Sequence, residues 1–215
     1  MRMKILIAVL ASICLIYSFS TLGANMFGWF KKQPVQLSSE VRGQILDNGK
    51  PVIGQIVSRE LIYIDEKVHF DQTVTDDKGF FYFPEKIIMS SIPSKPLVEH
   101  RISQAIFIDK KNRNYQDLQH KKNLNSDHDF YRLWNTTKPS YKNISAFTEK
   151  LSFLQCNIKN KKVSFEFGFD NGYYSYRGSS ICRWENDFLM TMLYDNGKTY
   201  IVHDNDINKL EELIR

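Results

Sequence analysis

Three copies of the tripeptide Asp-Asn-Gly most restrict how this chain can fold. They occupy residues 47–49, 170–172 and 195–197, and each lies between runs rich in β-branched and aromatic residues. Asn-Gly supplies the positive φ angles that tight hairpin turns require. The three turns therefore predict antiparallel hairpins. A calcium-binding loop is the competing interpretation, but the further acidic residues and the closing Glu that it needs are missing.

Other parts of the chain predict further strands. Residues 163–169 alternate apolar and polar side chains, which is typical of a strand with one buried face. Residues 110–148 are polar and predict an irregular, solvated connection, whereas Gly-Ser-Ser at 178–180 predicts a turn. Asp204 or Asp206 can cap a short helix that ends at Ile214. The remaining predicted strands cover residues 41–46, 52–57, 61–64, 68–75, 80–83, 100–109, 151–158, 188–194 and 198–203.

Two motifs in residues 41–84 carry a family resemblance. The first is a strand with Gly43 at its centre, followed by a turn and by Gly-Lys-Pro-Val-Ile-Gly at residues 49–54. The second is Thr-Asp-Asp-Lys-Gly-Phe-Phe-Tyr-Phe-Pro at residues 75–84. At this spacing they resemble the carboxypeptidase regulatory-like β-sandwich, also described as transthyretin-like or Cna-B-like, although Gln55 stands where that family usually has Ala. Residues 26–84 also resemble uncharacterised bacterial exported proteins built on this domain.

The resemblance implies the fold class, which is all-β: an antiparallel Greek-key β-sandwich. We expect C-terminal β-hairpins and a short terminal helix to extend it. The expected organisation is a leader at residues 1–24, the sandwich at 36–109, the irregular connection at 110–148 and a β-rich extension at 149–215. The fold itself implies no activity, because such domains serve structural, adhesive and ligand-binding roles.

The N-terminus has the three-part pattern of a secretory signal peptide. Residues 1–4 are short and basic, 5–19 form an uncharged apolar run, and small residues follow up to Ala24. Cleavage near Gly23 or Ala24 predicts a periplasmic or secreted protein. Two alternatives stay open: residues 5–24 as an uncleaved anchor in the inner membrane, and Met26 as the true start of an intracellular protein.

Cleavage of this leader would remove Cys14 and leave two cysteines, Cys156 and Cys182. An even pair in an exported chain favours one disulfide, which would stabilise the fold by roughly 3–4 kcal/mol in the chain-entropy model. Two separate buried thiols are the alternative. Because the sequence has no Cys-x-x-Cys pair, it predicts neither a zinc site nor a thioredoxin-like redox site.

Charge and motifs argue against several function classes. The net charge is +5, or +3 without Arg2 and Lys4 of the leader, which is too small to favour nucleic-acid binding. The sequence has no nucleophile elbow, zinc-protease motif or phosphate-binding loop. Asp127, His128 and Asp129, with His120 nearby, could bind a metal, but a polar loop is the simpler interpretation. We therefore expect a non-enzymatic protein with no catalytic residues, no metal and no cofactor.

An aromatic cluster in the last third of the chain is the predicted partner-binding site. It comprises Tyr173, Tyr174, Tyr176 and Trp184. Tyr173 and Tyr174 are adjacent, so in a strand one of them must face outward, and Tyr and Trp are enriched at protein interfaces. Packing in a sheet core is the alternative interpretation.

Together these features favour an exported, non-enzymatic protein that binds another protein. One concrete form is an immunity or inhibitor protein against a delivered toxin. A module for carbohydrate or another envelope ligand is the main alternative, which an exposed aromatic platform on one sheet would support. An enzyme of unrecognised type is the second alternative.

Overall fold

A computed structural model describes residues 31–64, 67–95, 101–114, 129–139, 145–168, 175–184, 190–195 and 198–203. The predicted leader and the predicted terminal helix lie outside these residues. Contacts divide the chain into two units, residues 1–35 with 88–99 and residues 36–87 with 100–215. Among the described residues, no helix is long and apolar enough to cross a membrane.

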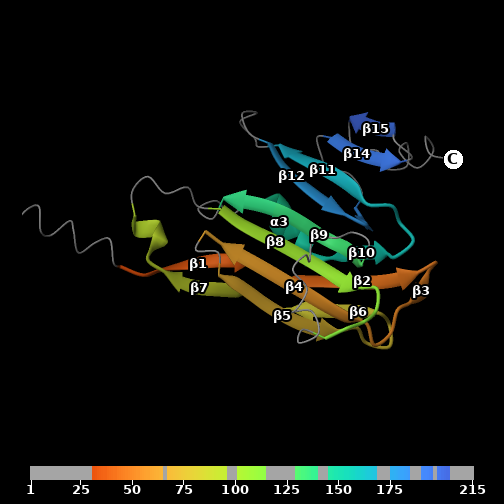
Figure 1. Cartoon of the computed structure of the whole chain (residues 1–215), viewed down its shortest axis with the longest axis horizontal. Coiled ribbons are helices and arrows are strands. Elements are labelled where there is room, and N and C mark those ends of the chain that lie inside the picture. The colour runs from red at the N-terminus through yellow and green to blue at the C-terminus, as the bar shows by residue number, and fades with distance from the viewer. Residues whose placement is uncertain are drawn as a thin grey trace, which may run out of the picture. The chain divides into compact units, whose positions relative to one another are not determined.

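Strands make up most of the described chain (Figure 1). The described residues also form one α-helix, α3 (Ser145–Ser152), and one 3₁₀ turn, η1 (Ile92–Ser94). The strands are β1 (Gln33–Ser38), β2 (Val41–Asp47), β3 (Lys50–Pro51), β4 (Ile56–Tyr63), β5 (Val68–Val74), β6 (Phe80–Phe83), β7 (Lys86–Ser90), β8 (Arg101–Asp109), β9 (Phe130–Pro139), β10 (Leu154–Asn157), β11 (Val163–Gly168), β12 (Ser175–Ser180), β13 (Cys182–Arg183), β14 (Met190–Asp195) and β15 (Lys198–His203).

The first unit contains η1 and the outer ends of β1 and β7, two strands that pair in a two-stranded sheet. The Ser94 hydroxyl donates a hydrogen bond to the backbone oxygen of Lys31 at 2.7 Å. It also accepts one from the side-chain amide of Gln33 at 3.0 Å. These bonds attach η1 to the segment that leads into β1.

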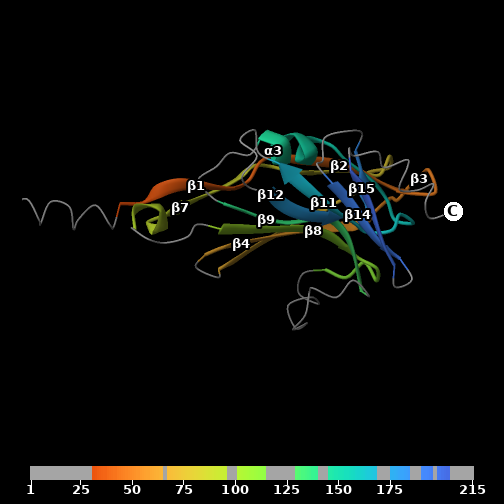
Figure 2. The same cartoon turned by 90° about the horizontal axis from the view of Figure 1, so that it is seen from above.

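Two sheets form the second unit. The larger has eight strands in the order β15-β14-β11-β12-β9-β8-β4-β5. The smaller has five strands, in the order β13-β10-β2-β3 with β6 also paired to β2. Figure 2 shows β2 and α3 in one layer and β4, β8 and β9 in the other. The prediction of an all-β, sandwich-like fold is confirmed.

The core of this unit lies between the two sheets. Alternate residues of β2 and β6 are buried, as expected for strands with one inward face. Trp184 packs edge-on against Trp134 and Phe165, with ring centroids 5.9 and 5.3 Å apart. The buried core residues are Val41, Ile45, Val57, Phe81, Phe83, Ile106, Ile108, Leu133, Trp134, Leu151, Leu154, Cys156, Val163, Phe165, Ile181 and Cys182.

Two of the predicted Asp-Asn-Gly hairpins are confirmed. In the first, Asp47 pairs with Lys50 across a two-residue turn in which Asn48 and Gly49 have φ angles of 50° and 81°. In the third, Asp195 pairs with Lys198 across residues 196–197. The second turn lies outside the described residues, but β11 and β12 on either side of it pair antiparallel.

The expectation of an irregular connection at residues 110–148 is wrong in two places. Residues 130–139 form β9, which lies between β8 and β12 in the larger sheet, and residues 145–152 form α3. The strand escaped prediction because a bulge at Ile106 and Phe107 shifts its register against β8. As a result Leu133 and Trp134, although adjacent, are both fully buried, which breaks the alternation expected of a strand.

The predicted C-terminal extension is part of the sandwich. Strand β10 lies between β2 and β13 in the smaller sheet. It pairs with β2 in parallel, from Leu154 opposite Gly43 to Asn157 opposite Leu46, whereas we expected antiparallel pairs throughout. A parallel neighbour cannot come from a hairpin, so a pattern of turns does not reveal it. The predicted turn at residues 178–180 is also wrong, because these residues belong to β12.

Candidate binding groove

An open groove of about 470 Å³ lies beside β6 and is lined by residues of both sheets, including Thr73 and Val74 at the end of β5. Aromatic side chains dominate its lining, and all lining residues belong to the second unit. The lining comprises Arg42, Gly43, Thr73, Val74, Asp76, Phe80, Phe81, Tyr82 and Phe153.

Strand β6 places two aromatic rings in this groove because it consists of four aromatic residues in succession. Alternation buries Phe81 and Phe83 in the core and leaves Phe80 and Tyr82 on the outer face, 38% and 45% exposed. Phe153, 46% exposed, is the third ring, and its centroid lies 6.4 Å from that of Phe80. Three large aromatic side chains thus share one exposed site.

The turn before β6 fixes where these rings stand. The buried Thr75 hydroxyl donates to the Val52 oxygen at 2.7 Å and accepts from the Gln55 backbone N–H at 2.9 Å. One carboxylate oxygen of Asp76 accepts from the backbone N–H groups of Lys78 and Phe80 at 2.9 and 2.8 Å. The Thr-Asp motif recognised in the sequence therefore builds the turn that begins β6.

Two glycines allow the close packing beneath the groove. Gly79 has a φ of +78°, and a Cβ there would lie 2.5 Å from the Ile45 oxygen. A Cβ at Gly43 would lie 2.5 Å from the Phe81 ring and 2.8 Å from the Leu154 oxygen. Only glycine lets Phe81 pack across β2 while β10 pairs on its other side.

A polar network forms one wall of the groove. The Arg42 Nε donates to Glu40 Oε1 at 2.7 Å, and the Tyr82 hydroxyl donates to Glu40 Oε2 at 3.2 Å. The Arg42 guanidinium lies over the Tyr82 ring, 5.1 Å from its centroid. The hydrogen bond from Arg42 keeps the pKa of Glu40 below its ordinary value. The charged residues of the lining are therefore Arg42, which is paired with Glu40 outside the lining, and Asp76.

A buried ion pair supports β6 from below. The Arg59 side chain is fully buried and donates to both carboxylate oxygens of Asp71, at 2.9 and 2.6 Å. It also donates to the Pro84 oxygen at 2.8 Å and lies over the Phe83 ring at 4.7 Å. One side chain thus links β4, β5 and the end of β6.

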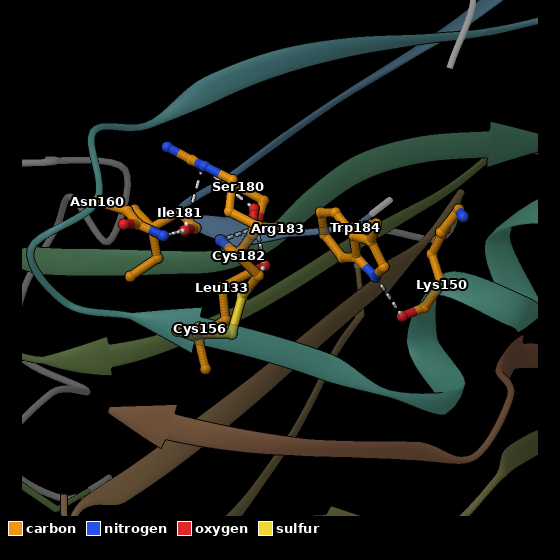
Figure 3. The surroundings of a disulfide bond; sticks show 9 residues. All are labelled: Leu133, Lys150, Cys156, Asn160, Ser180, Ile181, Cys182, Arg183 and Trp184. Atoms are coloured by element: carbon orange, nitrogen blue, oxygen red, sulfur yellow. Dashed lines mark hydrogen bonds between the residues drawn. A yellow bond between two sulfur atoms is a disulfide. The ribbon is translucent and has the colours of Figure 1, made fainter. Parts of the chain in front are cut away.

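The third ring depends on the predicted disulfide, which the structure contains (Figure 3). Cys156 of β10 and Cys182 of β13 are directly opposite each other. The Cys182 backbone N–H donates to the Ser180 hydroxyl at 2.7 Å. The disulfide ties β10 to β13, and Phe153 immediately precedes β10.

The same region anchors α3. The Trp184 indole N–H donates to the backbone oxygen of Lys150 in α3 at 3.2 Å, as Figure 3 shows. Leu151, the next residue of α3, is buried in the core. Both contacts fix the short segment between α3 and β10 in which Phe153 lies.

Of the predicted cluster of Tyr173, Tyr174, Tyr176 and Trp184, only the Trp184 side chain belongs to the described residues. Tyr173 and Tyr174 lie outside the described residues, as does the side chain of Tyr176, although its backbone belongs to β12. Trp184 is partly buried and packs against the core, and the cluster as a partner-binding site stays a prediction.

The residues that line the groove were missed by the sequence analysis. The signal was present in β6, because four successive aromatic residues in a strand must leave two of them exposed. Arg42 could have followed from its place opposite Tyr82 in an antiparallel pair. No local pattern identifies Phe153, which approaches Phe80 only through the fold.

The part of the chain that the structure describes contains no group of three or more His, Cys, Asp or Glu side chains suited to holding a metal. Of the candidate ligands named from the sequence, His120, Asp127 and His128 lie outside the described residues. Asp129 immediately precedes β9.

Comparison with known protein families bears on residues 41–129. Residues 41–129 are similar to the family described as Domain of unknown function (DUF6795). The matched range includes Arg42, Phe80 and Tyr82 of the groove but not Phe153. No curated protein and no solved structure matches the chain.

Proposed function

We propose that this protein is a non-enzymatic binding protein, and that its partner is another protein that docks on the groove of Phe80, Tyr82 and Phe153. One observation carries the proposal: these three rings are exposed together, whereas Phe81 and Phe83 of the same strand fill the core. Aromatic and Arg side chains are enriched at the centres of protein interfaces, and Arg42 completes that composition here.

The proposal includes export to the periplasm or the exterior. The N-terminal pattern of a signal peptide supports it, with an inner-membrane anchor as the alternative. The disulfide between Cys156 and Cys182 also supports it, because such bonds persist in oxidising compartments. An immunity or inhibitor protein against a delivered toxin is one form that such a protein can take.

We also propose that the sandwich is of the carboxypeptidase regulatory-like type. The two motifs that carry this resemblance have matching physical roles. Gly43 permits close packing across β2, and Thr75 and Asp76 build the turn before β6. A sandwich of this type serves as a scaffold and implies no activity by itself. The proposed binding role belongs to the groove.

Carbohydrate binding is the second candidate, since the exposed rings form an aromatic surface on one sheet. Two features make it weaker than protein binding. The Phe80 and Phe153 rings are tilted by 48° and so form no flat platform. Arg42 lies over the Tyr82 ring, which leaves less of that ring for stacking against a sugar.

The test is mild crosslinking in the native host, followed by purification of the tagged protein and mass spectrometry of what is retained. The wild type is compared with a Phe80→Ala/Phe153→Ala double variant. Gln155→Ala is the matched control, because Gln155 is exposed in β10 but does not line the groove. The same spectra read the N-terminus of the protein and thereby test export.

We expect one stoichiometric protein partner with the wild type and with Gln155→Ala, and at least a tenfold loss with the double variant. Equal retention by all three proteins would place the partner elsewhere and refute the groove as its site. A mature N-terminus near Gly23 or Ala24 supports export, whereas a start at Met26 contradicts it.

A further inference from the structure

The edges of the two sheets differ in how well they are protected against pairing with another chain. Strands β3 and β13 have only two residues each. Strand β6 is followed by Pro84, which has no N–H, and the outward N–H and C=O of Phe80 bond to Asp76. Strand β5 carries Asp71, a charged side chain turned toward the buried Arg59. Short strands, proline and inward-pointing charges are features by which natural sheets oppose an added strand.

Strand β15, at the other end of the larger sheet from β5, has none of these features (Figure 1). It has six residues and no proline, and it pairs with β14 at consecutive positions without a bulge. Lys198 is its first residue, and the Thr-Tyr-Ile-Val sequence that follows favours a strand. A regular and largely apolar edge of this length is suited to pairing with a further strand.

The hairpin that joins β14 to β15 determines which backbone groups of β15 face outward. A two-residue hairpin closes with a hydrogen-bonded pair, here Asp195 and Lys198. Because bonding alternates along an antiparallel pair, every second residue of β15 from Lys198 onward bonds to β14. The N–H and C=O groups of Thr199, Ile201 and His203 therefore face away from β14, and no backbone group of the described residues bonds to them.

These outward groups match a second copy of the same strand in one register. When two copies run antiparallel with Ile201 opposite its own counterpart, Thr199 of each copy lies opposite His203 of the other. All three outward residues then exchange both of their backbone hydrogen bonds with the second copy. A shift of the register by two residues leaves one of the three outside the pair, so the pairing centred on Ile201 is the most complete.

The side chains of β15 also suit this pairing. Tyr200 packs against the core, so alternation puts Thr199 and Ile201 on the opposite face of the sheet. Ile201 is 48% exposed there, although it is a large apolar residue. In the centred pair it lies beside its own counterpart, whereas the two copies of Lys198 lie at opposite ends and avoid a like-charge contact. One twofold axis thus satisfies backbone, apolar and charged groups together, which favours a second copy over an unrelated strand.

We infer that this protein forms a symmetric dimer in which the larger sheets of two copies join through β15. Such an interface uses the same surface of both copies. The groove meets the larger sheet at Thr73 and Val74 of β5, the strand at the opposite end of that sheet. The dimer and the groove therefore use different edges, and the dimer presents two grooves to a multivalent partner. This inference goes beyond the proposed function and does not depend on it.

The test measures the molar mass of the protein purified from its native host, by sedimentation equilibrium over a range of concentrations. Ile201→Lys and Ile201→Glu each place like charges opposite each other in the centred pair, so each should weaken dimerisation at least tenfold. An equimolar mixture of the two variants should restore it, because opposite charges then face each other. Ile53→Lys is the matched control: Ile53 is 65% exposed, lies outside β15 and the groove lining, and should leave dimerisation within twofold.

Hydrogen exchange of the wild type gives a readout that needs no variant. The amides of Thr199 and Ile201 should exchange more slowly at concentrations at which the dimer forms, because their N–H groups are then bonded. Unchanged exchange in a dimeric protein would place the interface elsewhere and refute the inference. The Phe80→Ala/Phe153→Ala variant should dimerise as the wild type does, so the dimer and the proposed binding role are tested separately.

Three other results would overturn the inference. The first is a wild type that stays monomeric at every concentration, and the second is a dimer that Ile201→Lys leaves intact. The third is a mixture of the two charged variants that remains monomeric, because the centred register requires their charges to meet. If a monomeric wild type loses its crosslinked partner on Ile201→Lys, β15 pairs with that partner instead of with a second copy.

Discussion

Strand β2 has two flanks that are built in different ways. On one side it pairs with β6, which follows it within 40 residues and is fixed by the Thr75–Gly79 turn. On the other side it pairs with β10, which is held by a disulfide to β13. The groove takes Phe80 and Tyr82 from the first flank and Phe153 from the second. Nearby residues in the chain thus determine the β6 part of the groove, whereas contacts between distant parts of the chain determine the position of Phe153.

Removing the disulfide tests the β10 flank. Cys156→Ala/Cys182→Ala should lower the free energy of unfolding by about 3–4 kcal/mol, because the unfolded chain gains the entropy of the released loop. Denaturation in urea measures the loss. Hydrogen exchange should accelerate in β10 and β13 and remain slow in β6. Equal acceleration in both flanks would show that they are not held independently.

Breaking the buried ion pair tests the β6 flank. Asp71→Ala should cost about 3 kcal/mol, because it leaves the fully buried Arg59 without its carboxylate partner. This value is at the lower end for buried pairs since the Asp71 side chain is 30% exposed. Urea denaturation is compared with that of Asp77→Ala, an exposed turn residue. A loss below about 1 kcal/mol would mean that Arg59 finds other partners.

Substituting the glycine between the flanks should disturb both of them. Gly43→Ala places a methyl group against the Phe81 ring and the Leu154 oxygen, so we expect a loss of about 2 kcal/mol from overpacking. Hydrogen exchange should accelerate in β6 and β10 together. Acceleration in one flank alone would identify the side that gives way, and Gln155→Ala should leave both unchanged.

A charged pair outside both flanks provides a reference with the smallest expected effect. Burial raises the pKa of Asp109, but hydrogen bonds and charge from Arg113 outweigh it and keep that pKa below its ordinary value. The resulting stabilisation is present above the unfolded pKa of about 3.9 and is lost as the pH falls through the lower folded pKa.

Arg113→Met should therefore reduce stability by about 1 kcal/mol at pH 7, as is typical of partly exposed pairs. The difference from the wild type should shrink as the pH is lowered below about 4. Urea denaturation at several pH values measures it. A difference that is independent of pH would show that the Arg113 side chain acts through packing instead of charge.

The sequence predicted the β6 flank well and the β10 flank poorly. Hairpin turns and the motifs in residues 41–84 depend on residues that are close together in the chain, so the local sequence is enough to predict them. Strand β9 was missed because a bulge places Leu133 and Trp134 in the core side by side. The parallel seam between β2 and β10 has no local signature, since neither strand is adjacent to the other in the chain.

The residues of the candidate site likewise differ in how far the sequence predicts them. Alternation in β6 predicts that Phe80 and Tyr82 are exposed, although the sequence analysis applied that reasoning only to Tyr173 and Tyr174. Phe153 lies between a helix and a strand that only the complete fold defines. Cys156 and Cys182 were the exception, because cysteine count and the predicted export suggested their pairing without any knowledge of the sheets.

The parallel pairing of β2 with β10 also determines the order in which the strands of the smaller sheet can assemble. Gly43 and its partner Leu154 are 111 positions apart, so β2 must wait for most of the chain before its second neighbour exists. Pairings at such distances fold slowly, and an unpaired strand edge invites association with other chains in the meantime. The disulfide between Cys156 and Cys182 includes a residue that is synthesised later still. It can therefore stabilise the completed sheet but cannot initiate its formation. During synthesis, the open side of β2 is therefore the surface that a chaperone has most reason to cover.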